Sequence, residues 1–206
     1  MSNDKYQNKY RIPSSRWQGY DYGADGCYYV TICTKNRIHY FGEIVDGEMR
    51  LSEIGKIAEK VWIEIPKHFP FVILDEFVIM PNHVHGILII LKTDENNGDV
   101  INGDVINRGD VINRDVINHV STRLKIGGIT GNHCPMLHQN LGRVLRWFKG
   151  RVSFECHSFA DFAWQERFHD RIIRDHVGLN NIRAYIFNNP QNWNDDELNE
   201  NNIKTE

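Results

Sequence analysis

Apolar residues in the first part of the chain fall into short runs that predict two kinds of element. Residues 28–34, YYVTICT, are β-branched and aromatic, which is typical of a strand. Residues 39–51 predict a small hairpin, because an Asp-Gly pair supplies the turn between two short strands. Residues 52–69 predict an amphipathic helix that Ser52 caps. Its apolar positions recur at helical spacing and are Ile54, Ile57, Ala58, Val61 and Ile65.

Two further apolar runs, FVILDEFVIM and HVHGILII, stand on either side of Pro81 and Asn82. Each run is too short for a helix and is rich in Val and Ile, so the pair predicts two antiparallel strands joined by a turn. The turn comes directly before two histidines.

The second half of the chain predicts a helix, a strand and a final helix. Residues 140–156 carry an apolar stripe made of Leu141, Leu145, Phe148 and Val152. Residues 167–174 predict a strand, and residues 178–189 a helix that stops at Pro190. Without the hairpin and this last helix, the order is strand, helix, strand, strand, helix, strand. We therefore expect an α+β fold, a ferredoxin-like βαββαβ antiparallel sheet with helices on one face and an additional C-terminal helix.

A low-complexity segment interrupts this order. Asp-Val-Ile-Asn occurs four times, starting at Asp99, Asp104, Asp110 and Asp115. Four such copies cannot bury a core, so the repeat favours an insertion between two core elements. We expect an N-terminal extension over 1–26, one domain over 27–193 interrupted by the insertion at 94–130, and a disordered polar tail over 194–206.

Composition adds bounds to this picture. Apolar residues are 41% and charged residues 25% of the chain, and the net charge is -3, so no global positive field indicates a nucleic-acid partner. The four cysteines form no CxxC pair, which favours reduced thiols. The chain has no long apolar run and no signal-like N-terminus. We expect a soluble cytoplasmic protein without a membrane partner.

The clearest candidate chemistry is the pair of histidines in the apolar run. Because side chains alternate faces along a strand, His83 and His85 point the same way, and their two imidazoles are suited to bind one ion. Gly86 leaves room for a backbone or a ligand. The last helix offers Tyr185 and Asn189, which lie four residues apart on one helical face. The alternative interpretation makes the histidines core residues or ligands of a structural ion.

Tyr185 has two interpretations. Beside a phosphate-binding metal, its phenol is a candidate nucleophile that forms a covalent intermediate. Alternatively, Tyr185 packs against the core with its hydroxyl in water. The basic residues of the 140–156 helix are either a solvated face or a phosphate-contacting face, with Trp147 as a base-stacking surface. These basic residues are Arg143, Arg146 and Lys149.

Two further groups of residues are weaker candidates for a site. His133, Cys134 and His138 mimic half of a zinc site, but no second pair lies at a suitable spacing. His169 and Asp170 either serve proton transfer or end a strand.

Several blocks of the chain, in the same order, resemble the REP-associated tyrosine transposases, which are single-tyrosine HUH transposases. The blocks are GYDYGADGCYYVTICTKNR, YFGEI, FVIMPNHVHGILII, FAWQERFHDRIIRD and IRAYIFNNPQNW. The resemblance implies an endonuclease for DNA transposition and recombination that cuts and rejoins single-stranded DNA at imperfect hairpins. It makes Tyr185 the nucleophile and His83, His85 and Asn189 the ligands of Mg²⁺ or Mn²⁺. The implied intermediate is a 5′-phosphotyrosyl link beside a free 3′-hydroxyl.

Two features depart from that family's pattern. The Asp-Val-Ile-Asn repeat is not part of it, and the acidic balance is unusual for a DNA enzyme. The resemblance implies that five basic residues carry most of the phosphate contact: Arg143, Arg146, Lys149, Arg151 and Arg171. The alternative function is a catalytically inactive ferredoxin-like regulator that binds DNA or RNA. Both a monomer and a homodimer are compatible with the sequence.

Overall fold

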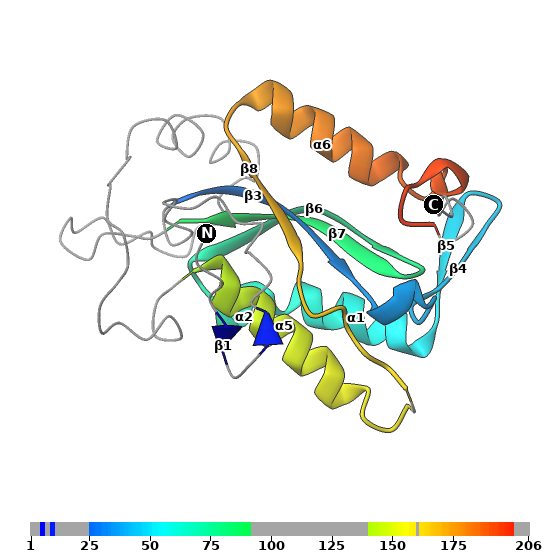
Figure 1. The fold of residues 1–206 in the computed structure, drawn as a ribbon. Coiled ribbons are helices and arrows are strands. Elements are labelled where there is room, and N and C mark those ends of the chain that lie inside the picture. The colour runs from blue at the N-terminus through cyan, green and yellow to red at the C-terminus, as the bar shows by residue number, and fades with distance from the viewer. Residues whose placement is uncertain (1–4, 7–8, 11–24, 92–139, 160, 200–206) are drawn as a thin grey trace.

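The structure is a computed structural model, and it describes residues 5–6, 9–10, 25–91, 140–159 and 161–199 (Figure 1). Its strands are β1 (Lys5–Tyr6), β2 (Lys9–Tyr10), β3 (Gly26–Cys33), β4 (Gly42–Val45), β5 (Glu48–Leu51), β6 (Val72–Met80), β7 (His83–Ile90) and β8 (His169–Ile173). Its helices are α1 (Glu53–Ile63), α2 (Ile65–His68), α5 (Leu141–Glu155) and α6 (His176–Asn188), with short 3-10 turns at Lys35–Arg37 and Trp193–Asp195. The expected insertion at 94–130 and the candidate zinc half-site at 133–138 lie outside the described residues.

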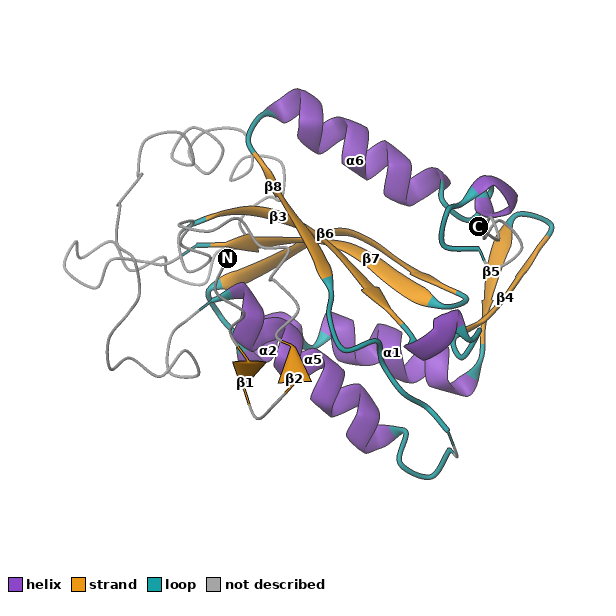
Figure 2. Cartoon of the chain, in the orientation of Figure 1, coloured by secondary structure: helices purple, strands orange, loops and turns teal. Residues whose placement is uncertain are grey.

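Four strands form one antiparallel sheet in the order β6-β7-β3-β8 (Figure 2). In chain order the four strands of this sheet are β3, β6, β7 and β8. The first and the third of them, β3 and β7, lie at the centre of the sheet. The α+β fold and the ferredoxin-like pattern expected from the sequence are thus confirmed. Within the described ranges, no helix has both the length and the hydropathy that crossing a bilayer requires.

Local sequence signals account for the element ends. Ser52, Asn140 and Asp175 cap α1, α5 and α6, each accepting a hydrogen bond from the backbone N–H three residues later. The single helix expected over 52–69 is instead divided at Glu64 into α1 and α2. Pro66 lies in the first turn of α2, where its missing N–H costs nothing, whereas inside one continuous helix it would break the backbone ladder.

The main core lies between the sheet and the helices α1 and α5, which run below the sheet in Figure 1. Trp62 of α1 is fully buried and packs against Phe77 and Phe148. A Cβ placed on Gly86 would lie 2.3 Å from Cζ2 of Trp62. The room expected at Gly86 for a ligand or a backbone is therefore filled by an indole ring on the helix side of the sheet.

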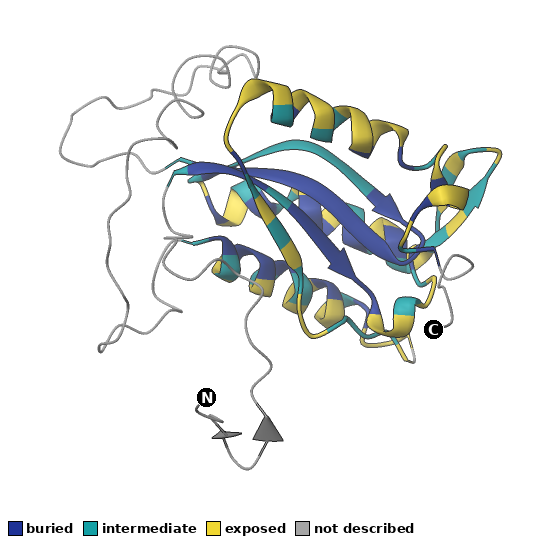
Figure 3. Ribbon diagram, turned by 45° about the horizontal axis from the view of Figure 1, so that its top comes forward, coloured by how far each residue is buried: buried dark blue, intermediate teal, exposed yellow. Residues whose placement is uncertain are grey.

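The opposite face of the sheet carries one helix of the described residues, α6, most of whose surface is exposed in Figure 3. A smaller apolar cluster joins this helix to the sheet, and its buried members are Cys27, Ile87, Ile89, Ile173, Leu179 and Ile186. All residues of β7 are buried, because strands flank it on both sides and helices cover both faces. The polar members of β7 therefore lie in a shielded part of the molecule.

The expectation of a disordered tail is wrong for residues 194–199. This segment follows α6, and its residues Asp196 and Asn199 are buried, as is the preceding Trp193. Its polar groups are satisfied locally: Leu198 N–H donates to Asp196 at 2.6 Å, and Asn199 Nδ2 donates to the Trp193 carbonyl at 3.0 Å. The polar composition gave no signal for this structure, because hydrogen bonds rather than periodic apolar contacts hold the segment in place.

Candidate metal and tyrosine site

Strand β7 presents His83 and His85 on the face of the sheet that α6 covers. Opposite them on β3 lie Cys33 and Thr31, and the two imidazole centroids are 4.4 Å apart. Both side chains are buried, with 0% and 2% exposure. Two imidazoles this close in a shielded place are a pair of candidate metal ligands, because the commonest metal-binding side chain is the neutral imidazole.

The surroundings of His83 determine which of its nitrogens is available. Its Nδ1 lies 2.8 Å from Oδ1 of Asn82, an oxygen that can only accept, so Nδ1 carries the proton and donates. Nε2 is buried and has no hydrogen-bond partner among the described residues. Burial, followed by the nearby His85, holds the pKa of His83 well below its ordinary value. The ring is therefore neutral, with a free lone pair on Nε2.

Asn82 also ties this histidine to distant parts of the chain. Its Nδ2 donates to the carbonyl of Arg37 at 3.1 Å and to the carbonyl of Leu198 at 2.9 Å. Its backbone carbonyl accepts from Thr34 N–H at 2.8 Å. One turn residue thus joins the loop after β3, the histidine strand and the C-terminal segment.

His85 is arranged in a similar way. Its Nδ1 lies 2.7 Å from Oη of Tyr29 and 3.0 Å from Oγ1 of Thr31, two hydroxyls that orient the ring. Burial lowers the pKa of His85 to about 3. Nε2 lies on the other side of the ring, 3.4 Å from Oη of Tyr185. Hydroxyl partners on Nδ1 leave Nε2 as the ligand atom, an arrangement common in metal-binding histidines.

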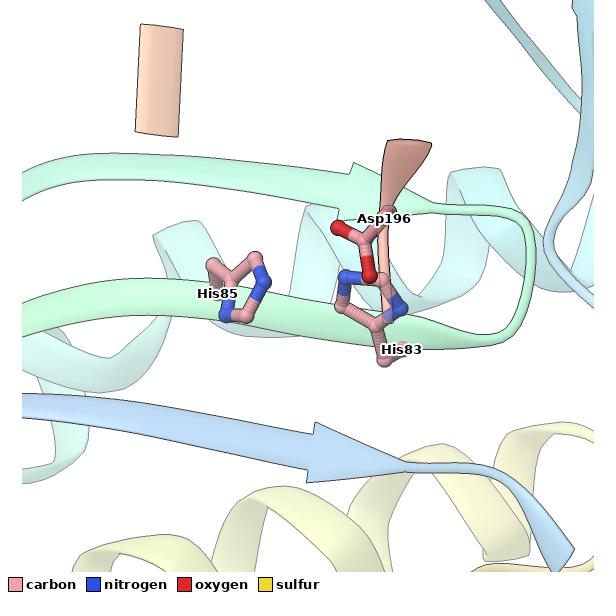
Figure 4. Close-up of side chains that lie close together, drawn as sticks. All are labelled: His83, His85 and Asp196. Atoms are coloured by element: carbon pink, nitrogen blue, oxygen red, sulfur yellow. The ribbon is translucent and has the colours of Figure 1, made fainter. Parts of the chain in front are cut away.

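Asp196 completes a cluster that the sequence did not predict. Ligand atoms of His83, His85 and Asp196 all lie within 4.8 Å of one another, and Figure 4 shows the carboxylate beside both rings. Asn189 Nδ2 donates to Oδ2 of Asp196 at 3.1 Å, whereas Oδ1 of Asn189 is buried without a partner among the described residues. Buried lone pairs that lack a donor, next to a carboxylate, are the surroundings that a cation satisfies.

Helix α6 places Tyr185 at the edge of this cluster. Its side chain is 47% exposed, while its hydroxyl reaches His85. Burial of that hydroxyl, followed by the charge of Asp196, raises the pKa of Tyr185 above its ordinary value. A side chain that is about half exposed and whose hydroxyl reaches the cluster can meet a large substrate such as a polymer.

The basic residues expected to contact DNA are divided between the two faces of the sheet. Arg171 of β8 is the cross-strand partner of Tyr29 and is exposed on the face of the histidines. The α5 residues lie on the other face, with helix α5. His169 pairs with Thr31 and shares the face of Arg171, whereas Asp170 points to the opposite face.

The α5 residues expected to contact DNA differ in how exposed they are and in whether they already have a partner. Arg143, Arg146 and Arg151 are exposed, and Arg151 donates to Glu155 at 2.7 Å. Lys149 donates to the carbonyl of Gln165 at 2.6 Å, and burial lowers its pKa. Trp147 is half-buried, with its ring centroid 4.3 Å from that of His68, so only part of its surface is open to a base.

No protein-family model matches the chain. An uncharacterized protein of Haemophilus influenzae (strain ATCC 51907 / DSM 11121 / KW20 / Rd) is 32% identical over 187 residues, which span 90% of this chain and 91% of that protein. The solved structure of a REP-associated tyrosine transposase bound to a REP hairpin is similar with a TM-score of 0.53 and 15% identity, covering 88% of this chain and 74% of that one. This similarity concerns the fold.

A second solved structure, a candidate transposase from Deinococcus radiodurans R1, has a TM-score of 0.40 and 14% identity, with 85% of this chain and 97% of that chain covered.

Proposed function

Because the chain belongs to the same family as the uncharacterized Haemophilus influenzae protein and has the fold of a REP-associated tyrosine transposase, we propose that it is a metal-dependent transposase-like enzyme. It cleaves and rejoins single-stranded DNA at hairpins through Tyr185. The observation that carries the proposal is the position of the Tyr185 hydroxyl, 3.4 Å from His85 in a cluster that also holds His83 and Asp196.

The cluster fits a divalent cation. His83 and His85 offer Nε2 atoms, Asp196 offers a carboxylate, and Asn189 offers an amide oxygen without another partner among the described residues. This mixed nitrogen and oxygen set suits Mn²⁺ or Mg²⁺. When bound, such an ion polarises the phosphate and lowers the pKa of a neighbouring hydroxyl, which offsets the raised pKa of Tyr185.

The reaction follows from the nucleophile. Oη of Tyr185 attacks the phosphorus of the DNA backbone, the bond from phosphorus to the 3′-oxygen breaks, and that oxygen leaves as a 3′-hydroxyl after taking up a proton. The phenol proton passes to solvent, to which Tyr185 is open. The product is a 5′-phosphotyrosyl adduct. Since one phosphodiester replaces another, a 3′-hydroxyl reverses the step without ATP.

The proposed DNA-contacting residues lie on both faces of the sheet and bind different parts of the DNA. Arg171, on the face of the histidines, binds the phosphates nearest the cleaved bond. The α5 residues bind more distant phosphates, and Trp147 stacks a base with the open part of its ring. Lys149 contributes least, because its ammonium already donates to the carbonyls of Gln165 and Glu166.

A covalent-adduct assay tests this function. The full chain is mixed with Mn²⁺ and labelled single-stranded hairpin DNA, and the adduct is separated under denaturing conditions. We expect an adduct with the unaltered chain, none with Tyr185→Phe, and similar DNA binding by both. Tyr40→Phe is the matched control, because the hydroxyl of Tyr40 donates to the carbonyl of Asp161 and to none of the cluster residues.

Three outcomes are informative in this assay. An undiminished adduct in Tyr185→Phe contradicts the assignment of the nucleophile. DNA binding without any adduct in the unaltered chain identifies the inactive regulator instead. Unfolding of metal-free protein or of His83→Ala identifies a structural ion.

A further inference from the structure

Helix α6 carries the proposed nucleophile but has a narrow apolar interface with the sheet. Its fully buried apolar side chains are Leu179 and Ile186, whereas α5 buries five residues on the other face. Apolar contacts are non-directional, so a narrow apolar strip constrains rotation of a helix about its own axis only weakly. Some directional contact is needed to fix where the Tyr185 phenol points.

A bidentate ion pair supplies that contact. Arg183 Nε lies 3.1 Å and 3.0 Å from the two carboxylate oxygens of Asp75, and its second terminal nitrogen donates to Oδ2 at 2.7 Å. The side chains are 30% and 12% exposed. The planar guanidinium fork fits a carboxylate in one orientation, so this pair fixes geometry more strictly than a single charge contact does.

A β-bulge in β6 accounts for the position of Asp75. Leu74 pairs with Leu88 and Phe77 pairs with Gly86, so Asp75 and Glu76 together face one residue of β7. The Glu76 N–H donates to Oδ1 of Asp75 at 2.9 Å. Bulges re-aim side chains, and here an edge strand directs a carboxylate to the helix above it.

The angular arrangement couples the ion pair to the phenol. Arg183 and Tyr185 are two positions apart, which is about 200° around a helix. They therefore flank the buried strip on its two sides, Arg183 toward β6 and Tyr185 toward His85. A rotation that lifts the phenol from His85 pushes Arg183 out of register with Asp75. For a group about 6 Å from the helix axis, a rotation of about 10° moves it by about 1 Å.

We propose that Asp75 and Arg183 are positioning residues that set the rotation of α6 and thereby hold the Tyr185 hydroxyl at the metal cluster. This inference rests on the proposed function, because its consequence is the rate at which Tyr185 attacks DNA. Misplacement of a reacting group by about 1 Å costs about 100-fold in rate.

The test separates rate from binding. Single-turnover adduct formation with saturating Mn²⁺ and hairpin DNA is measured for Asp75→Asn, Arg183→Gln and the double variant. Affinities for Mn²⁺ and for the hairpin are measured on the same proteins, and thermal unfolding confirms that each is folded. Glu76→Gln is the matched control, since Glu76 shares the bulge but not the ion pair.

We expect each single variant to slow adduct formation by about 10- to 100-fold with affinities changed less than about threefold, and the double variant to be no slower than the slower single one. Arg183→Lys, which keeps the charge without the fork, should recover part of the rate. Unchanged rates, or rates that fall only as far as the affinities do, overturn the inference. Failure of the unaltered chain to form an adduct overturns the proposed function instead.

A readout without catalysis accompanies this test. In protein labelled with 3-fluorotyrosine, the resonance lost in Tyr185→Phe is assigned to Tyr185, and bound Mn²⁺ broadens it according to distance. We expect less broadening in Asp75→Asn at equal Mn²⁺ occupancy. Equal broadening in the variant and the unaltered chain shows that the phenol has not moved and contradicts the positioning role.

Discussion

Acid should destabilise the metal-free protein because its two paired histidines are buried in the neutral form. Burial lowers the pKa of His85 from 6.5 to about 3. Between these values the unfolded chain binds a proton that the folded chain does not, so stability is lost as pH falls below about 6.5. At about pH 5 the loss from His85 is roughly 1.5 pH units at 1.36 kcal/mol each, or about 2 kcal/mol. His83, with its pKa also well lowered, acts in the same direction.

Urea unfolding followed by tryptophan fluorescence, in the presence of a chelator, measures this loss from about pH 7.5 to about pH 5. In His85→Gln one titrating group is gone, so the free energy of unfolding should fall less steeply, by about 1.4 kcal/mol per pH unit below pH 6. His157→Gln alters an exposed histidine and is the control. An identical pH slope in the unaltered chain and in His85→Gln would refute the argument that this ring is buried and neutral.

Two further predictions address the packing and the ligands. Gly86→Ala should lower the free energy of unfolding by at least about 1–3 kcal/mol in urea, because the added methyl meets the buried ring of Trp62, whereas Gly150→Ala, with open space around its new Cβ, should stabilise the chain slightly. Asp196→Asn should weaken Mn²⁺ binding at least about tenfold by calorimetry, with the exposed neighbour variant Asp195→Asn unchanged. Equal Mn²⁺ affinity in these two variants would remove Asp196 from the ligands.

The strands of the four-stranded sheet and the helices α1, α5 and α6 could be predicted because each has a local signal, whereas the short strands β1 and β2 were not predicted. Alternation and β-branched residues marked the strands, helical spacing marked α1 and α5, and Ser52 and Pro190 stand where their helices begin and end. The observed strand order β6-β7-β3-β8 agrees with the ferredoxin-like pattern that the element order predicted. The break after α1 also has a local cause, because Pro66 in the first turn of α2 lacks the N–H that a continuous helix would use there.

The candidate site was predictable only where its members share an element. The two-residue spacing of His83 and His85 and the four-residue spacing of Tyr185 and Asn189 follow from strand and helix geometry. Asp196 follows the end of α6 in a polar segment without periodicity, so nothing local connects it to a histidine far earlier in the chain. The Asp75–Arg183 pair likewise depends on a bulge and on the sheet order.

The turn between β6 and β7 is less replaceable than its length suggests. At the Asp46-Gly47 turn, the backbone needs only residues that tolerate positive φ, so other residues of that kind can take their place. The side-chain amide of Asn82 instead forms hydrogen bonds with three separate parts of the chain. It donates to the carbonyls of Arg37 and Leu198 and accepts from His83. An aspartate there would still accept from His83, but it would place an oxygen against the carbonyls of Arg37 and Leu198, and no single second change elsewhere could compensate at both. Substitutions are therefore tolerated more readily in the turn between β4 and β5 than in the turn between β6 and β7.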